Sequence, residues 1–347
     1  MKQEKAQVRV SWQRIMLMIL CGFLSLVLFV MIFATAYVEY LLDHITVDSN
    51  NPEIYETIPE DQASDPDQQF TAPSIHPTDV VIPTLPDTSK DEIAVDGVVN
   101  ILLIGEDRNP GEGRQRSDSM ILCSFNKKNN SITMISFLRD SYVSIPGYKD
   151  NKLNAAYQYR GPKLLNQTLA LNFGVYVDAD IMIDFEGFKK LIDLLGGVDI
   201  ELTQAEADHL NQVYYTNLKA GFQRLNGREA LLYSRIRVID MDAMRAQRQR
   251  KVLTALVNSY KNKDITEMIS LAEEIITGGY VTTTMSAQQL TGYIMTLFPM
   301  LADATINNQQ IPAKGTYVDR SVGKVGDCKV MDFEINRKIL ENIFYPS

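Results

Sequence analysis

The chain has 347 residues and a formal net charge of −9, and 45% of its residues are hydrophobic. This composition is ordinary for a globular protein with one large domain or two smaller ones. The negative charge is concentrated in residues 39–92, and the remainder of the chain beyond them is balanced. A neutral folded part argues against nucleic-acid binding, which usually needs a broad basic face. The three cysteines and three histidines are scattered, which excludes a disulfide framework and the ligand spacing of a zinc site.

Residues 15–38 form an uninterrupted run without a charged side chain. At about 1.5 Å of helix rise per residue, the run is long enough to cross a bilayer core of about 30 Å. The alternative is a cleaved signal peptide, but its apolar core is usually only about 7–15 residues long. We therefore predict a transmembrane helix. Because basic residues precede it and acidic residues follow it, we place residues 1–14 in the cytoplasm and the later chain outside the cell membrane.

Residues 39–95 are predicted to be an extracellular linker. Most of the chain's prolines lie here, together with many Asp, Thr, Ser and Gln residues. The segment shows no apolar periodicity and has too little apolar surface to fold, so we expect it to be extended and disordered.

Residues 96–347 mix strand-like and helix-like patterns, which predicts a single layered α/β domain. The first strands are expected to form a hairpin around the turn at 127–130, and Thr203 with Glu206 has the pattern of a helix capping box. Strands are predicted at 98–107, 118–126, 131–140, 179–185, 198–202 and 306–313, and helices at 161–174, 186–197, 203–214, 265–277, 286–298 and 333–344.

The segment 225–251 is rich in arginine and is predicted to form two helical pieces with a break at 238–241. In the second piece, Asp242, Arg245 and Gln249 are spaced to share one helix face, and Arg248 lies one position off that line. Guanidinium groups match phosphate or carboxylate oxygens with a fork of donors, so several of them together indicate a polyanionic ligand. The alternative is a solvated charged helix face.

Charged and polar residues also gather at the ends of the predicted strands, where ligand sites form in α/β folds. Two aspartates among them are candidates for binding a hard cation such as Mg²⁺, although both are equally well explained as turn or cap residues. These positions are Asp107, Arg108, Arg116, Asp118, Arg139 with its neighbour Asp140, Lys152 and Asn154.

Six motifs in order resemble the LytR-CpsA-Psr family of membrane-anchored cell-wall enzymes. They are NILLIGEDR, RSDSMIL, LRDS, KLNAAY, LIDLLGGVDI, and LNGREALLYSRIR with the following DAMRAQRQ, between residues 100 and 249. Many relatives have proline where this chain has Leu138 and histidine where it has Ala155, and the spacer between Arg237 and Asp242 is short.

The resemblance implies an α/β/α sandwich with an apolar tunnel for a lipid. It implies a phosphotransferase that moves a glycopolymer from a polyprenyl-pyrophosphate carrier to peptidoglycan at the cytoplasmic membrane, with Mg²⁺ as cofactor. The metal ligands would be Asp107 and Asp118. The pyrophosphate would be clamped by Arg116, Arg139, Arg235, Arg237 and Arg245, with Asp242 orienting arginines and Gln249 contacting phosphate.

Two other functions remain open from the sequence. A hydrolase of polyprenyl pyrophosphates would use the same site with water as the acceptor. A non-catalytic lipid-binding regulator of the envelope would need the tunnel alone, and the apolar helices that offer material for a tunnel are equally suited to an ordinary core.

Overall fold

The computed structural model describes residues 97–106, 114–237, 239, 242–260, 274–275 and 277–344. The predicted transmembrane helix at 15–38, the linker at 39–95 and most of the helix predicted at 265–277 lie outside these residues. Among the described residues, no helix is both long enough and apolar enough to span a bilayer.

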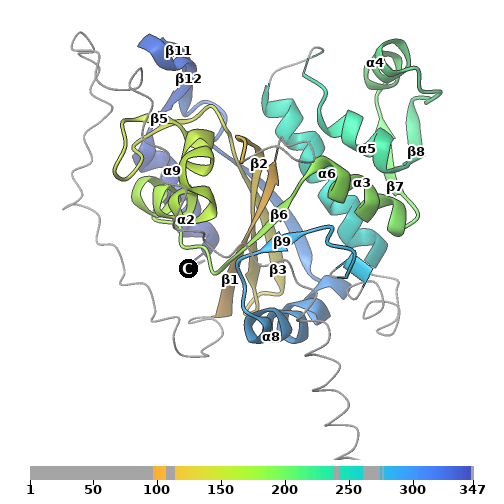
Figure 1. The fold of residues 1–347 in the computed structure, drawn as a ribbon, viewed down its shortest axis with the longest axis horizontal. Coiled ribbons are helices and arrows are strands. Elements are labelled where there is room, and N and C mark those ends of the chain that lie inside the picture. Colours follow the sequence, from red (N-terminus) through yellow and green to blue (C-terminus); the bar gives the residue numbers. More distant parts are fainter. Residues whose placement is uncertain are drawn as a thin grey trace, which may run out of the picture. The chain divides into compact units, whose positions relative to one another are not determined.

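A mixed six-stranded sheet forms the centre of the domain (Figure 1). Its strand order is β10-β3-β2-β1-β6-β9, with β1 antiparallel to β2, β2 antiparallel to β3, and β1 parallel to β6. The predicted hairpin of the first strands is confirmed. The strands are β1 (Val98–Glu106), β2 (Ser117–Asn126), β3 (Ser131–Phe137), β6 (Ala179–Ile183), β9 (Thr282–Thr283) and β10 (Thr305–Ile311).

Apolar side chains point to both faces of this sheet, so both faces must be covered. On β1, Leu102 and Ile104 belong to the core beneath α2 (Leu153–Phe173) and α9 (Phe333–Phe344). Ile101 and Leu103 on the same strand face the opposite core, which α6 (Asp242–Tyr260) and α8 (Ala287–Leu297) cover together with the 3-10 helix η3 (Phe298–Ala302). The result is the three-layered α/β/α arrangement that the family resemblance implied (Figure 1).

A smaller cluster of elements packs beside α6 around its own apolar core. It consists of α3 (Phe185–Leu194), β7 (Val198–Leu202), α4 (Gln204–Tyr214), β8 (Gly221–Leu225) and α5 (Gly227–Ser234), with β7 and β8 paired as an antiparallel hairpin. The predicted capping box at Thr203 and Glu206 is present. At the start of α5, a Cβ on Gly227 would lie 2.1 Å from the carbonyl oxygen of Lys189, so only glycine permits this close approach of α5 to α3.

Several short elements were not predicted. They are β4 (Tyr142–Val143), β5 (Asn151–Lys152), β8, β9, η3, β11 (Tyr317–Val322), η4 (Gly323–Val325) and β12 (Gly326–Met331). Four of the six side chains of β11 are exposed and Val322 is the only buried one, so the strand shows no apolar alternation that would mark it in the sequence. The helix predicted from Gly161 begins earlier, at Leu153, because a kink at Arg160 and Gly161 accommodates Pro162 within α2.

A buried carboxylate on β6 makes a prediction about stability. Asp180 is only 4% exposed and accepts hydrogen bonds from Asn166 and Thr284, and burial raises its pKa to about 6. A raised pKa means that the folded state holds this proton more tightly, so stability is lost as the pH rises from about 4 to about 6. We expect Asp180→Asn to increase the free energy of unfolding at pH 7 by about 1–2 kcal/mol, measured by urea denaturation.

Repeating the urea denaturation at several pH values provides the control. The advantage of Asp180→Asn should shrink at pH 4, where the wild-type carboxyl is already protonated in the folded state. Asp303→Asn removes a carboxylate from an exposed position and should change the free energy of unfolding at pH 7 by less than about 0.5 kcal/mol. Identical pH profiles for Asp180→Asn and the wild type would contradict the assignment.

Candidate active site

Several of the predicted charged positions meet at one edge of the central sheet. Because β2 runs antiparallel to β1 and β3, its first residues lie beside the last residues of those two strands. Asp118 is the second residue of β2, and Arg139 follows β3 by two positions. The connection between α5 and α6 brings Arg237 to the same place from 119 residues farther along the chain.

A continuous network of ion pairs connects these side chains. The Asp118 carboxylate accepts hydrogen bonds from Arg139 Nη1 at 2.6 Å and from Arg237 Nη2 at 3.0 Å. The Arg139 Nε atom lies 3.3 Å from the Asp140 carboxylate, which also lies 3.0 Å from Lys152 Nζ. Arg139 is therefore held between two carboxylates, and its orientation is fixed before any ligand binds.

Asp140 stabilises the cations around it. Burial alone would raise the pKa of its carboxyl, but the Arg139 charge and the Lys152 hydrogen bond outweigh burial, and the pKa is lowered. Asp140 is therefore ionised at neutral pH and acts as the counter-ion that positions Arg139 and Lys152.

Lys152 and Asn154 support the loop after β3. Lys152 lies in β5 and immediately precedes α2. Asn154 is buried in the first turn of α2, and its backbone N–H donates to the carbonyl oxygen of Arg139 at 3.2 Å. Asn154 thus holds the backbone of Arg139 in place through this hydrogen bond. The Lys152 ammonium group is part of the ion-pair network through Asp140.

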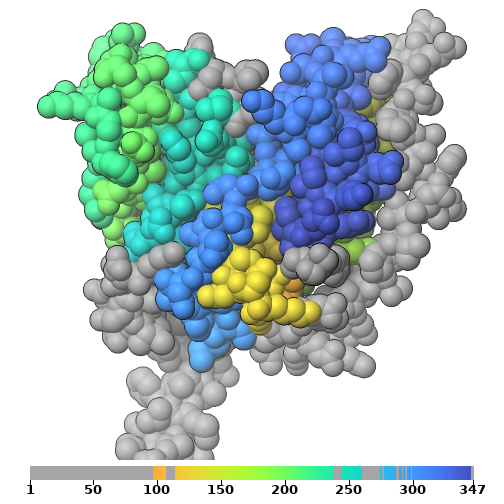
Figure 2. All heavy atoms as spheres, turned by 180° about the vertical axis from the view of Figure 1, so that it is seen from behind, coloured from red at the N-terminus to blue at the C-terminus, as the bar shows by residue number. Residues whose placement is uncertain are grey.

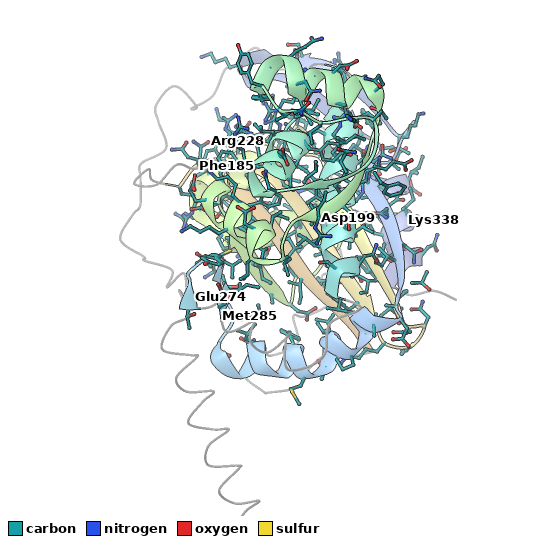
Figure 3. The ribbon with its side chains drawn as sticks, turned by 90° about the vertical axis from the view of Figure 1, so that its right-hand side faces the viewer. Phe185, Asp199, Arg228, Glu274, Met285 and Lys338 are labelled. Carbon is teal, nitrogen blue, oxygen red and sulfur yellow. The ribbon has the colours of Figure 1, made fainter. Side chains whose placement is uncertain are left out.

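Two other predicted arginines lie at the margins of this network. The Arg116 Nε atom donates to Gln158 Oε1 on α2 at 3.0 Å. The Arg235 guanidinium lies 4.2 Å from the ring centroid of Phe185, which Figure 3 shows at the start of α3. The backbone at Arg235 is helical rather than extended, so Arg235 and Arg237 contact different partners, with buried Ile236 between them.

An apolar cavity of about 190 Å³ opens beside the ion-pair network. The charged and amide side chains that line the cavity include Glu106, Asp118, Asp184, Arg235, Arg245 and Gln249. Arg245 and Gln249 therefore share one face of α6, as their spacing predicted. The remaining walls come from the sheet and from α3, α5 and α6, and include Ile121, Ile183, Phe188, Leu191, Leu253 and Leu256.

Of the remaining predicted residues, Arg248 is the one whose side chain the structure describes. Arg248 is buried and forms an ion pair with Glu206 at 2.8 Å, and it also donates to the carbonyl oxygen of Ile236 at 3.1 Å. It therefore fixes the α5–α6 connection instead of lining the cavity. The predicted residues Asp107 and Arg108 and the side chain of Asp242 lie outside the described part of the structure.

Sequence reasoning missed Glu106, the last residue of β1. Its buried carboxylate lines the apolar cavity and accepts a hydrogen bond from the Tyr157 hydroxyl group on α2. A signal was present, because Glu106 is the first charged residue after an apolar strand and directly precedes Asp107. Phe185 was also missed, and an aromatic residue at a helix start gives no comparable signal.

The described cations around this edge outnumber the described carboxylates. The cations are Arg116, Arg139, Lys152, Arg235, Arg237 and Arg245, and the carboxylates are Glu106, Asp118, Asp140 and Asp184. An excess of positive charge beside an apolar cavity suits an anion that carries a long apolar group. The fold and the site thus define an α/β/α protein with a site for an amphipathic anion.

The chain belongs to the LytR_cpsA_psr family, whose model matches residues 53–332. It is 31% identical over 253 residues to the regulatory protein MsrR of Staphylococcus aureus (strain Mu50), covering 71% of this chain and 74% of that protein. It is 34% identical over 249 residues to the polyisoprenyl-teichoic acid–peptidoglycan teichoic acid transferase TagU of Oceanobacillus iheyensis, covering 69% and 73%. The solved structure of TagT bound to LIIa-WTA is similar with a TM-score of 0.60 and 25% identity, covering 72% of this chain and 93% of TagT.

Proposed function

We propose that this protein transfers a glycopolymer from a polyprenyl-pyrophosphate carrier to peptidoglycan and releases polyprenyl phosphate. The observation that carries the proposal is the composition of the apolar cavity, whose lining includes Asp118 of the ion-pair network together with Arg235 and Arg245. The cavity suits the polyprenyl chain, and the arginines suit the pyrophosphate. The transferase name of the TagU relative supports the same reaction class.

In this reaction, a hydroxyl oxygen of the acceptor attacks the phosphorus atom that carries the glycopolymer. A new phosphodiester bond forms as the hydroxyl group gives up its proton to solvent, and the bond from that phosphorus to the bridging oxygen breaks. Negative charge then develops on the departing polyprenyl phosphate. Phosphoryl transfer depends mainly on positioning and on charge stabilisation, and guanidinium groups held in place by Asp118 and Asp140 provide both.

We also propose that Mg²⁺ assists at this site, with Asp107 and Asp118 as its protein ligands. Mg²⁺ usually takes one or two protein carboxylates and completes its shell with water and substrate phosphates, so a dense cluster of ligands is not required. The bound cation would neutralise charge on the phosphate oxygens.

The acceptor determines where this reaction must occur. Peptidoglycan lies outside the cytoplasmic membrane and the polyprenyl carrier lies within it, so the catalytic domain has to face outwards next to the bilayer. The uncharged run at 15–38, followed by the acidic segment 39–95, is the membrane anchor and linker that we propose for this purpose.

The test uses the full-length protein in detergent with a short-chain polyprenyl-pyrophosphate-linked saccharide, Mg²⁺ and a peptidoglycan fragment. The expected product is a peptidoglycan fragment that carries the saccharide through a phosphodiester, with polyprenyl phosphate released in equal amount. Release of polyprenyl phosphate with only free saccharide phosphate would instead establish a hydrolase. Binding of the lipid without product under any acceptor condition would establish a lipid-binding regulator.

A substitution that fills the apolar cavity should weaken lipid binding and leave the rest of the fold intact. Leu253 on α6 lines the cavity, and Leu253→Trp would fill space that the polyprenyl chain needs. We expect the affinity for a short-chain polyprenyl pyrophosphate to fall at least about tenfold, because burial of several methylene groups is lost. Met295→Trp, at an exposed position of α8, is the matched control and should bind normally. Equal affinity of Leu253→Trp and the wild type would place the lipid elsewhere.

A further inference from the structure

A second, polar cleft lies on the opposite side of α6 from the apolar cavity. It has a volume of about 530 Å³ and is enclosed by α6, the hairpin strand β7 and the edge strand β10. Figure 2 shows this face, where the teal residues of α6 reach the surface between the green and the blue segments. In Figure 3, Asp199 of β7 lies beside the same helix. The residues of α6 that line this cleft include Gln247, Arg250, Lys251 and Asn258, whereas the apolar cavity takes Arg245 and Gln249 from the same helix.

The cleft contains a buried cation, Arg250, with two nitrogen atoms that have no hydrogen-bond partner among the described residues. Arg250 is 8% exposed, and within the described part of the chain its Nε and Nη1 atoms have no hydrogen-bond partner. Burial lowers the pKa of its guanidinium to about 10, so the group still carries its charge at neutral pH. A buried and unpaired guanidinium destabilises a protein unless a ligand satisfies its donors.

The other groups around Arg250 define the kind of ligand that fits. Lys251 adds a second cation, and the amides of Gln247, Asn258 and Asn308 both donate and accept hydrogen bonds. Asp199 and Glu201 line the opposite wall, but the Asp199 carboxylate is already paired with Arg224 at 3.2 Å. Carboxylates and amides together suit the hydroxyl groups of a ligand. The two neighbouring cations, Arg250 and Lys251, suit one anionic group on the same ligand.

We propose that this cleft binds an anionic saccharide unit, with its phosphate or carboxylate at Arg250 and its hydroxyl groups on the amides and carboxylates of the walls. The volume exceeds that of a single inorganic anion, and the polar lining is unsuited to the polyprenyl chain. The existence of a saccharide site follows from the cleft itself, and only the source of the saccharide rests on the proposed function. A sugar phosphate would come from the transferred glycopolymer, and a sugar carboxylate would come from the acceptor glycan.

The experiment measures binding by ligand-detected NMR to the full-length protein, without turnover. The probes are glucose 6-phosphate, glucuronate, glucose and inorganic phosphate. We expect one of the two anionic sugars to bind and neutral glucose to bind at least about tenfold more weakly, since the charged hydrogen bonds are lost. Preference for glucose 6-phosphate assigns the cleft to the polymer, and preference for glucuronate assigns it to the acceptor. Equal binding of glucose, binding of inorganic phosphate alone, or no binding would overturn the proposal.

Four variants test whether the anionic sugar binds in this cleft. Arg250→Gln should weaken the anionic sugar at least about tenfold, while Lys338→Gln, which removes an exposed cation from α9, should have no effect. Asn308→Asp introduces a negative charge at an exposed cleft position and should weaken binding in the same way, even if Arg250→Gln fails to fold. Asp118→Asn should retain binding, because Asp118 lies at the other site. Loss with Asp118→Asn and retention with Arg250→Gln would assign the sugar to the active site instead.

Discussion

Asp118→Ala is expected to lower the rate of polymer transfer by about a thousandfold or more, which is at or above the usual upper range for losing one group that stabilises transition-state charge. The Asp118 carboxylate holds Arg139 at 2.6 Å and Arg237 at 3.0 Å, so its removal releases two arginines at once. The same substitution also removes one proposed ligand of Mg²⁺. The measurement is the initial rate of saccharide transfer to a peptidoglycan fragment by the full-length protein.

Asp118→Asn separates positioning from metal binding. The amide keeps the size of the side chain but loses the charge that binds the arginines and a cation. If Asp118 binds Mg²⁺, this variant should need a higher Mg²⁺ concentration for half-maximal rate, whereas a purely orienting role would leave that concentration unchanged. Asp319→Asn is the matched control, because Asp319 also pairs with a cation, Lys329 at 2.6 Å, away from the site. Full activity of Asp118→Asn at every Mg²⁺ concentration would remove Asp118 from the mechanism.

The parts of the fold that could be predicted from the sequence are those with a buried apolar pattern. The strands β1, β2, β3 and β6 are continuous apolar runs, because both faces of the sheet are covered by helices. By contrast, β11 and β12 are short and mix polar with apolar residues, and they contribute only a few side chains such as Val322, Cys328 and Met331 to the cores. Helix caps were predictable where the capping residues are adjacent in sequence, as at Thr203 and Glu206.

The candidate site shows the same division between local and long-range information. Arg245 and Gln249 are one helical turn apart, so their common face follows from spacing alone. The ion-pairing role of Arg248 could not be predicted from spacing, because its partner Glu206 is 42 residues away and belongs to another helix. The contact of Arg237 with Asp118 was expected from the family resemblance only as a shared site, and the direct ion pair required the three-dimensional arrangement.

The ion pair between Arg248 and Glu206 should have the largest effect on stability. Both side chains are almost completely buried and lie 2.8 Å apart. We expect Arg248→Met to lower the free energy of unfolding by about 3–5 kcal/mol, because the substitution leaves the Glu206 carboxylate buried without its cation. Urea denaturation at pH 7 measures this change. Arg228→Met, which replaces an exposed arginine on α5, is the matched control and should cost less than about 1 kcal/mol.

The pH dependence of this loss identifies its cause. In the wild type, burial acts to raise the pKa of Glu206, but the hydrogen bond from the Thr203 backbone and the contacts with Arg248 outweigh it and lower the pKa. The pair therefore contributes stability above the unfolded pKa of Glu206, and that contribution is lost as the pH falls through the folded pKa. The deficit of Arg248→Met should accordingly be largest at neutral pH and shrink in acid, and the added substitution Glu206→Gln should recover part of it. A deficit that is the same at pH 4 and pH 7 would mean that lost packing, not the unpaired carboxylate, causes the effect.

The same pair connects stability to the active site. Arg248 also donates to the carbonyl oxygen of Ile236, the residue that immediately precedes Arg237. Without that hydrogen bond, the connection between α5 and α6 is held less firmly, and the Arg237 guanidinium is no longer fixed beside Asp118. We therefore expect Arg248→Met to reduce transfer even at temperatures where the protein remains folded. Arg248 thus acts on the reaction by positioning Arg237, although it lies outside the cavity that receives the substrate.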